Sequence, residues 1–132
     1  MNATLYDRQE SNSPLNGTKI THSDQLRSVL STVRDREPFF AELIGDNGFK
    51  LLLGLGSYEG CVQFSSVEGD PPYLMAVAPR VDESKPERSF LIGNTPTPIP
   101  ARFALPSEVL LSIAGEFIDS GGRSEMVTWE EI

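Results

Sequence analysis

Three groups of residues have types and spacing that could support chemistry. The first is the glycine-rich segment GLGSYEG at residues 54–60, with the spacing G-x-G-x-x-x-G. A nucleotide-binding loop needs glycines that lead into a helix N-terminus, where backbone N–H groups hold phosphate. Here a strand pattern follows instead, so we interpret the segment as a hairpin turn.

The second group is Cys61 and His22, the only cysteine and the only histidine of the chain. A nucleophilic thiol needs a base or a cationic neighbour. His22 precedes a predicted helix, whereas Cys61 lies in a predicted strand, so we interpret Cys61 as a buried strand residue. One cysteine also excludes an internal disulfide and a zinc site built from several cysteines. We therefore expect no metal and no cofactor.

The third group is a set of carboxylates that could pair as general acid and base, at Glu42, Glu59, Glu68 and Asp70. Acidic residues in turns are mostly solvated, and catalysis needs them to converge in a pocket. We therefore predict that the chain is not an enzyme. A small hydrolase or nucleotide-binding enzyme is the alternative, and it would require a convergent polar pocket.

The elements that must position these residues begin after a polar start. Residues 1–16 are rich in Asn, Ser, Asp and Gln and show no apolar period. We expect a flexible N-terminal tail over 1–16 and a single domain over 17–132. A short strand at 17–21 opens the domain, and a helix follows with Ser23 as N-cap and Pro38 as its limit. The apolar face of this helix combines Leu26, Val29, Leu30 and Val33.

Four strand patterns follow the helix and are separated by three turns. Asp46-Asn47-Gly48 is typical of a tight hairpin turn, and turns are also expected at 56–60 and 68–72. The arrangement predicts an antiparallel meander. Alternate turns of a meander share one end of the sheet, so 46–48 and 68–70 lie together and Glu59 lies at the other end. The alternating apolar residues are Phe39, Ala41 and Leu43, then Phe49, Leu51, Leu53 and Leu55, then Val62 and Phe64, then Tyr73, Met75 and Val77.

The rest of the chain predicts a charged loop at 79–88, a strand at 90–93, a sheet edge at 94–100 and a further strand at 102–105. Prolines at 96, 98 and 100 remove N–H donors from one side of the extended segment, which favours a protected edge over a polyproline ligand. A second helix starts near 106 and ends at 120–122. Its buried face combines Leu110, Ile113, Ala114 and Phe117.

The predicted fold class is α+β, a mainly antiparallel meander sheet of about five to seven strands with two helices on one face. Trp129, near the end of the chain, is expected to pack on the core rather than to form a partner-binding tail.

Charge and composition restrict the partners. The chain has 19 acidic and 11 basic residues and a formal net charge of −8. This surface repels phosphates, so we expect no nucleic-acid binding. It attracts a basic protein, although the same charge could serve solubility alone. No signal-peptide pattern and no membrane-length apolar run are present, so we expect a cytoplasmic protein that does not bind membranes.

Three stretches carry a family resemblance: PFFAELIGDNGFKLLLGLGSYEGCVQFS at 38–65, FLIGNTPTPIPARFALP at 90–106 with its Gly93-Asn94 pair, and GGRSEMVTWEEI at 121–132. Together they resemble an immunity-protein family of bacterial polymorphic toxin systems, the type numbered first. The similarity covers residues 18–132 and contains no catalytic signature. It assigns no counterpart to the 80–88 loop or to the N-terminal tail.

The resemblance implies an α+β fold and a tight complex with a cognate toxin, usually of deaminase fold. Such a toxin acts on nucleic-acid bases through a zinc-bound water, and an acidic inhibitor can occupy its basic substrate groove. We therefore predict a one-to-one inhibitor that covers the active site of a basic toxin, a cytidine deaminase. The alternative is a non-inhibitory adaptor or chaperone-like module. The expected contacts are Asp46, Asn47, Tyr58, Glu59, Glu68, Asp70, Tyr73 and Asn94.

Overall fold

The computed structural model describes residues 1–78 and 86–132. The charged loop expected at 79–88 lies largely outside the described residues, and its last two positions, Glu87 and Arg88, already belong to a strand. Within the described residues no helix has the length and apolar character needed to cross a membrane.

The described residues form two α-helices and ten strands, so the fold class is α+β as predicted, but the expected count of five to seven strands is too low. The path through the sheet runs β10-β6-β5-β4-β3-β1-β2. The strands of this path are β1 (Ala3–Asp7), β2 (Thr18–Ile20), β3 (Phe39–Gly45), β4 (Phe49–Leu55), β5 (Glu59–Ser66), β6 (Leu74–Val77) and β10 (Thr128–Glu131).

The strands β3, β4, β5 and β6 form the predicted antiparallel meander. Leu43 pairs with Leu51, Leu53 pairs with Val62, and Phe64 pairs with Leu74. These side chains point to one face of the sheet because neighbours across paired strands share a face. The segment GLGSYEG is the predicted hairpin turn, since β4 ends at Leu55 and β5 begins at Glu59.

The N-terminal segment differs from the expected tail. Residues Ala3–Asp7 form β1, which lies inside the sheet between β3 and β2 and pairs antiparallel with both. Ala3, Leu5 and Leu15 are buried in the main core. The segment lacks a long apolar period because only alternate residues of one short strand face the core, so composition alone suggested a tail.

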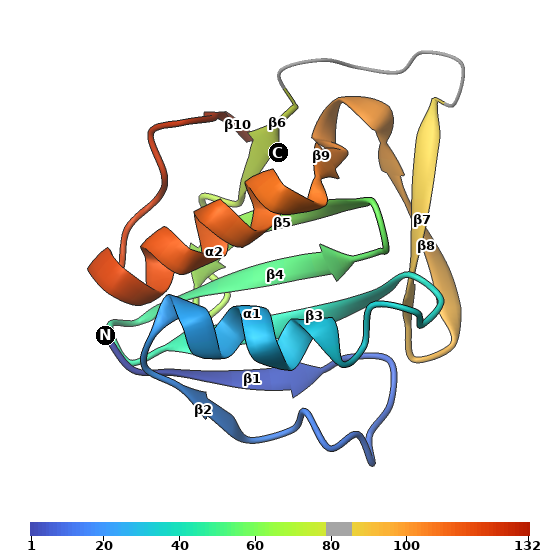
Figure 1. Ribbon diagram of the computed structural model, residues 1–132. Helices are drawn as coiled ribbons and strands as arrows, with labels where there is room; N and C mark the ends of the chain where they lie inside the picture. The colour runs from blue at the N-terminus through green and yellow to red at the C-terminus, as the bar shows by residue number, and fades with distance from the viewer. Residues whose placement is uncertain (79–85) are drawn as a thin grey trace.

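Both helices cover one face of the sheet, as predicted (Figure 1). Helix α1 (Ser23–Ser31) buries Leu26 and Leu30, and α2 (Ser107–Ser120) packs beside it. The N-cap of α1 is His22 rather than Ser23. The helix ends at Ser31, where the hydroxyls of Ser31 and Thr32 bond to carbonyls of the last turn.

Helix α2 buries the predicted residues and ends at Ser120. The C-cap residue Gly121 has a φ of 77°, the left-handed conformation that glycine adopts freely. Trp129 in β10 packs edge-on against Phe64 with ring centroids 6.3 Å apart, as expected for a core-packing residue.

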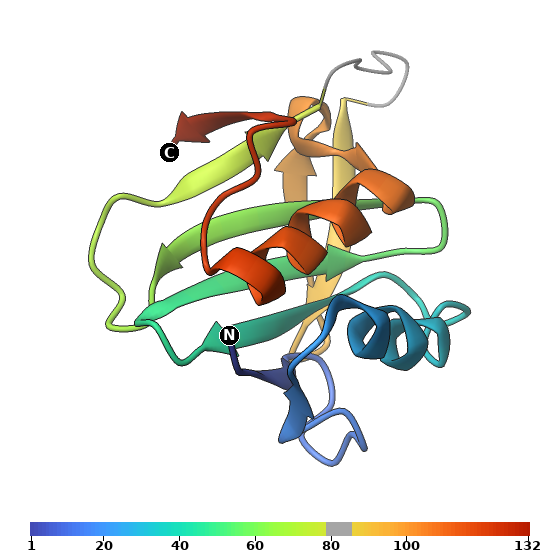
Figure 2. The same cartoon turned by 60° about the vertical axis from the view of Figure 1, so that its left-hand side comes forward.

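A hairpin of β7 (Glu87–Ile92) and β8 (Thr95–Pro100) lies against the other face of the sheet (Figure 2). It packs there on a second, smaller core. Strand β8 pairs only with β7 among the described residues, which fits the edge predicted from its prolines. The second core contains Phe40, Cys61, Met75, Phe90, Ile99 and Phe103.

Two further differences concern short segments. The strand expected at 102–105 is a 3-10 helix, η1 (Ala101–Phe103), followed by the two-residue β9 (Leu105–Pro106), which pairs with β5. In β6, Met75 and Val77 do share a face, but it is the face opposite the helices.

Candidate functional site

The turns of the meander bring three predicted contact residues to one end of the molecule. The β3–β4 turn carries Asp46, and the β5–β6 connection carries Glu68 and Asp70. The backbone N–H of Val67 donates to the carbonyl of Gly48 at 2.9 Å, which fastens the two turns together. The predicted grouping of these turns, away from Glu59, is therefore confirmed.

We call the exposed carboxylates of Asp46, Glu68 and Asp70 the acidic end. All three residues are exposed. Within the part of the chain that the structure describes, none of them forms an ion pair with a lysine or an arginine. The C-terminal turn of α2, with exposed Asp119, lies at the same end (Figure 2). The C-terminal end of a helix carries partial negative charge, which adds to the charge of these carboxylates.

Asn47 and Tyr73 hold the turns that carry these carboxylates. The amide of Asn47 donates to the carbonyl of Gly121 at 2.9 Å and accepts from the N–H of Phe49 at 3.2 Å. The Tyr73 hydroxyl donates to the carbonyl of Gly69, and the Tyr73 carbonyl accepts from the N–H of Ile132 at 2.9 Å. Both side chains therefore already have partners within the protein.

Tyr58 and Glu59 lie at the opposite end of the sheet, in the β4–β5 turn. Tyr58 is 82% exposed, and its carbonyl accepts from the N–H of Ser107 at 2.9 Å. Glu59 pairs with Arg88, with Nε and Oε1 3.0 Å apart. A cleft of about 260 Å³ lies beside this turn, between the two helices, and is lined partly by Arg27, Arg34 and Glu59.

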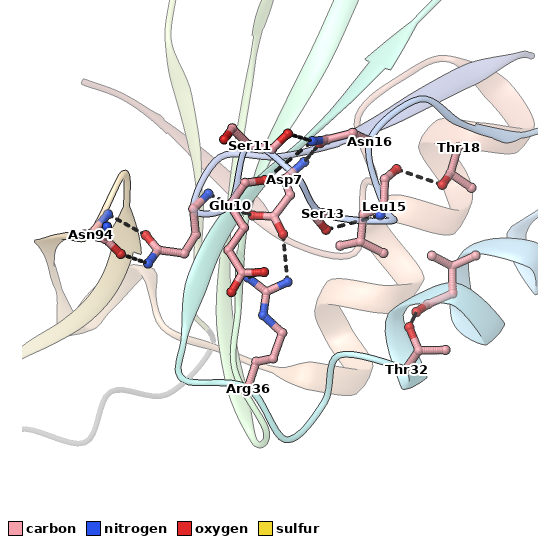
Figure 3. A network of polar contacts seen from close by, with 12 residues as sticks. Asp7, Glu10, Ser11, Ser13, Leu15, Asn16, Thr18, Thr32, Arg36 and Asn94 are labelled. Carbon is pink, nitrogen blue, oxygen red and sulfur yellow. Dashed lines mark hydrogen bonds and ion pairs between the residues drawn. The ribbon is translucent and has the colours of Figure 1, made fainter.

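Asn94 lies in a third place, the β7–β8 turn, with φ at 67°. Its N–H donates to Gln9 Oε1 at 2.7 Å, and Gln9 Nε2 donates back to Asn94 Oδ1 at 2.6 Å (Figure 3). This reciprocal pair fastens the hairpin to the loop after β1, so Asn94 has a structural partner. The eight predicted contacts thus occupy three separate locations.

The same loop is organised by Asp7, whose side chain is 0% exposed and pairs with Arg36 at 2.7 Å (Figure 3). The N–H groups of Gln9 and Glu10 also donate to Asp7. Burial by itself raises the pKa of Asp7, but hydrogen bonds from Arg36 and from the backbone outweigh it and hold the pKa below its ordinary value. The Arg36 guanidinium also lies 3.7 Å from the centroid of the Phe39 ring.

The predicted contacts leave out one further surface. It is the part of the sheet face opposite the helices that the β7–β8 hairpin does not cover. We call it the open face. One row of cross-strand neighbours crosses this side of the sheet as Tyr6, Glu42, Leu52, Gln63, Met75 and Glu130, of which Met75 is buried in the second core. The sequence contains a signal for this open face. The strand positions that alternate with the core residues hold Glu42, Ile44, Lys50 and Leu52.

Glu42 lies on the open face between two basic residues. It pairs with Lys50 at 2.8 Å and also with Arg8. Burial by itself raises the pKa of Glu42, but the hydrogen bond and charge of Lys50 and the charge of Arg8 outweigh it and lower the pKa. Glu42 therefore stays ionised at neutral pH.

Two observations bear on the nucleophile and metal-site alternatives. Cys61 is buried on β5, as predicted, and burial raises the pKa of its thiol to about 12. It is therefore protonated at neutral pH and is not a nucleophile. No three side chains of His, Cys, Asp or Glu in residues 1–78 and 86–132 gather as metal ligands would.

Comparison with known protein families identifies a match. The model of the family described as immunity protein Imm1 matches residues 16–131. No curated protein matches the chain.

Proposed function

The chain belongs to the immunity protein Imm1 family, and from this premise we propose that it binds and neutralises a cognate toxin by covering the toxin's active site. An immunity protein acts through a complex with a toxin, so the partner is a protein. We propose a one-to-one complex in the cytoplasm of the producing cell, with inhibition by contact and no reaction on the immunity protein.

The acidic end is the observation that supports this proposal. Asp46, Glu68 and Asp70 are exposed and without ion pairs among the described residues, on a chain of net charge −8. The two turns that carry them are hydrogen-bonded to each other, so little conformational entropy is lost when a partner docks. Such a preorganised negative surface accelerates encounter with a basic protein and strengthens the complex where a contact becomes buried.

A deaminase toxin fits this surface. An enzyme that acts on nucleic-acid bases needs a positively charged groove for the phosphate backbone. The carboxylates of the acidic end could take the place of those phosphates and exclude the substrate. We propose a cytidine deaminase because the resemblance to this family implies a deaminase-fold toxin.

The proposed contacts are narrowed here by their position in the fold. We propose Asp46, Glu68 and Asp70 as the primary contacts, with Asn47 and Tyr73 positioning the turns that carry them. Tyr58 and Glu59 lie at the opposite end of the sheet, and Asn94 lies in the hairpin turn. These three would meet the toxin only where it extends beyond the acidic end.

The test is a titration of the toxin encoded by the adjacent gene, with deamination of a cytosine-containing oligonucleotide as the readout. We expect activity to fall to zero at one equivalent of the immunity protein. If deamination persists when binding has been demonstrated and is saturated, the result would favour the adaptor function. Absence of binding, together with no rescue of growth on co-expression, would refute the proposal.

A pair of double variants locates the contact. The E68K/D70K variant should weaken inhibition strongly, because each substitution places a positive charge against a basic partner. The D35K/E37K variant changes the charge equally at exposed residues of the α1–β3 connection, which lies at the other end of β3. It should inhibit as the unmodified protein does, and equal inhibition by both variants would exclude the acidic end as the contact.

A further inference from the structure

A groove lies where the β7–β8 hairpin meets the open face. It has a volume of about 310 Å³, with a floor that includes Leu52, Gln63 and Met75. Its wall is the hairpin, through Thr97 and Ile99 among others. Ile92 and Ile132, which are exposed apolar residues, stand at its border. An apolar groove of this kind on a charged protein is typical of a binding surface.

On the part of the open face over β1–β4, basic residues outnumber acidic ones, in contrast to the chain as a whole. Lys19, Thr4, Ile44 and Lys50 form one row across four strands. Lys19 Nζ donates to Thr4 Oγ1 at 3.2 Å and has no ion pair among the described residues. Leu52 of the groove lies two residues beyond Lys50 on β4, so both side chains point to the same face.

The balance of charges over β1–β4 is therefore positive, whereas Glu130, which pairs with Arg102, and the C-terminal residue Ile132 lie on the other side of the groove. Arg8 and Lys50 share a single carboxylate, that of Glu42, whose side chain is only 12% exposed. Lys19 adds a further positive charge. A partner segment with a carboxylate would complement this rim, and an apolar side chain next to that carboxylate would reach the groove.

We propose that the groove and the cations Lys19, Arg8 and Lys50 form a second toxin-binding surface, which accepts an apolar side chain flanked by an acidic residue. This inference rests on the proposed function, because it assigns the occupant to the same toxin. The acidic end then meets a basic region of the toxin, and the open face meets an acidic segment of it. Two surfaces of opposite charge fix the orientation of the partner, which one acidic patch alone does not.

Size and charge favour a protein segment over the other occupants. The groove is at the lower limit of small-molecule sites, which span roughly 300–1,000 Å³, so it suits a side chain better than a large cofactor. A second copy docked through the same face would bring the two positive rims together, because a two-fold interface places like patches opposite each other. The resulting repulsion disfavours self-association there.

The first test fills the groove. Thr97→Trp places a large side chain on the groove wall, and Thr95→Trp places the same side chain two residues away on β8, outside the groove lining. We expect T97W to raise the Kd for the adjacent-gene toxin about tenfold or more, whereas T95W leaves it unchanged. Circular dichroism and urea unfolding verify that both variants are folded.

The second test reverses a charge and does not depend on T97W folding. Lys19→Glu should raise the Kd several-fold and flatten its dependence on salt. Arg34→Glu makes the same change at an exposed arginine beside the cleft at the far end of the sheet, and it should bind as the unmodified protein does.

The outcomes separate this inference from the proposed function. If the unmodified protein inhibits the toxin and folded T97W and K19E inhibit equally well, the groove inference is wrong and the proposed function stands. If the unmodified protein does not bind the toxin, both are wrong. A dimer of the unmodified protein that T97W dissociates, detected by light scattering, would assign the groove to a second copy and overturn the inference.

Discussion

At the residue scale, Asp7 is a buried carboxylate in a segment that composition describes as polar and unstructured. It accepts hydrogen bonds from two backbone N–H groups and from Arg36. Arg36 arrives from a segment 29 residues further along the chain. Because this pairing is long-range, no local sequence pattern indicates it.

Removing the charge of Asp7 should destabilise the protein. Asp7→Asn removes the buried carboxylate partner of Arg36 and leaves only the exposed Glu10, and we expect a loss of about 2–3 kcal/mol in the free energy of unfolding. Urea unfolding followed by circular dichroism measures it. The matched control is Glu10→Gln, because Glu10 is a second, exposed partner of Arg36 at 3.7 Å, and it should cost about 0.5 kcal/mol or less. Equal losses would contradict a special role for the buried pair.

Asp7 and Glu42 also predict how stability depends on pH. Both have a pKa lowered from ordinary values of 3.8 and 4.5. A lowered folded pKa contributes stability that is fully present above the unfolded value and is lost as the pH falls through the folded value. We therefore expect stability to fall progressively below about pH 4.5. Urea midpoints from pH 7 to pH 3 test this, and the double variant D7N/E42Q should show a shallower acid dependence than the unmodified protein.

At the element scale, local patterns predicted some elements and not others. The meander was predictable because its turns are short and its strands alternate, so each pairing follows from neighbours in sequence. Strand β1 was not, because its partner β3 begins more than thirty residues later and only Ala3 and Leu5 give an apolar signal. The position of the β7–β8 hairpin was also not predictable from local patterns. Its residues were predicted as a strand and an edge, but not as a cover for Phe40 and Cys61.

The contribution of strand β1 to stability can be tested by deletion. Deleting residues 1–7 uncovers the edge of β3 and removes the buried side chains of Ala3 and Leu5 together with Asp7. We expect the truncated chain to lose more than about 4 kcal/mol and to be largely unfolded. Substitutions in the exposed loop of the same segment, N12A/P14A, should change stability by about 0.5 kcal/mol or less. A truncated chain with native circular dichroism would restore the interpretation of a tail.

The proline-containing edge of β8 makes a separate prediction about association. Pro96, Pro98 and Pro100 alternate along the strand, so its outer side lacks N–H donors. The triple variant P96T/P98T/P100T supplies those donors and should self-associate through the edge as concentration rises. Sedimentation velocity measures this. The T95V/T97V variant raises the β-propensity of the strand without adding a donor and should stay at the mass of the unmodified protein; association of both would point to apolar contact instead.

At the scale of the whole molecule, charge is distributed unevenly over the fold. The net charge of −8 is a sum over the sequence. The carboxylates that can meet a partner are decided by where folding places the unpaired ones. Composition predicted an acidic surface and the turn pattern predicted which turns share an end. The positive open face was not predicted, because Lys19, Arg8 and Lys50 come from three different strand regions and meet only after β1 and β2 join the sheet.

This distribution predicts the salt dependence of association with a basic toxin. The association rate constant should fall steeply with ionic strength, because the Debye length shrinks to about 8 Å at 0.15 M salt and screens steering between separated charges. Stopped-flow mixing over a salt series measures the slope. In E68K/D70K, two acid-to-lysine changes of +2 each move the formal net charge from −8 to −4, and the slope should flatten. The D35K/E37K variant makes the same change in net charge elsewhere, so it should keep a steeper slope if location rather than net charge governs steering. If both variants flatten the slope equally, the toxin responds to the charge of the whole molecule and the acidic end has no special part in the encounter.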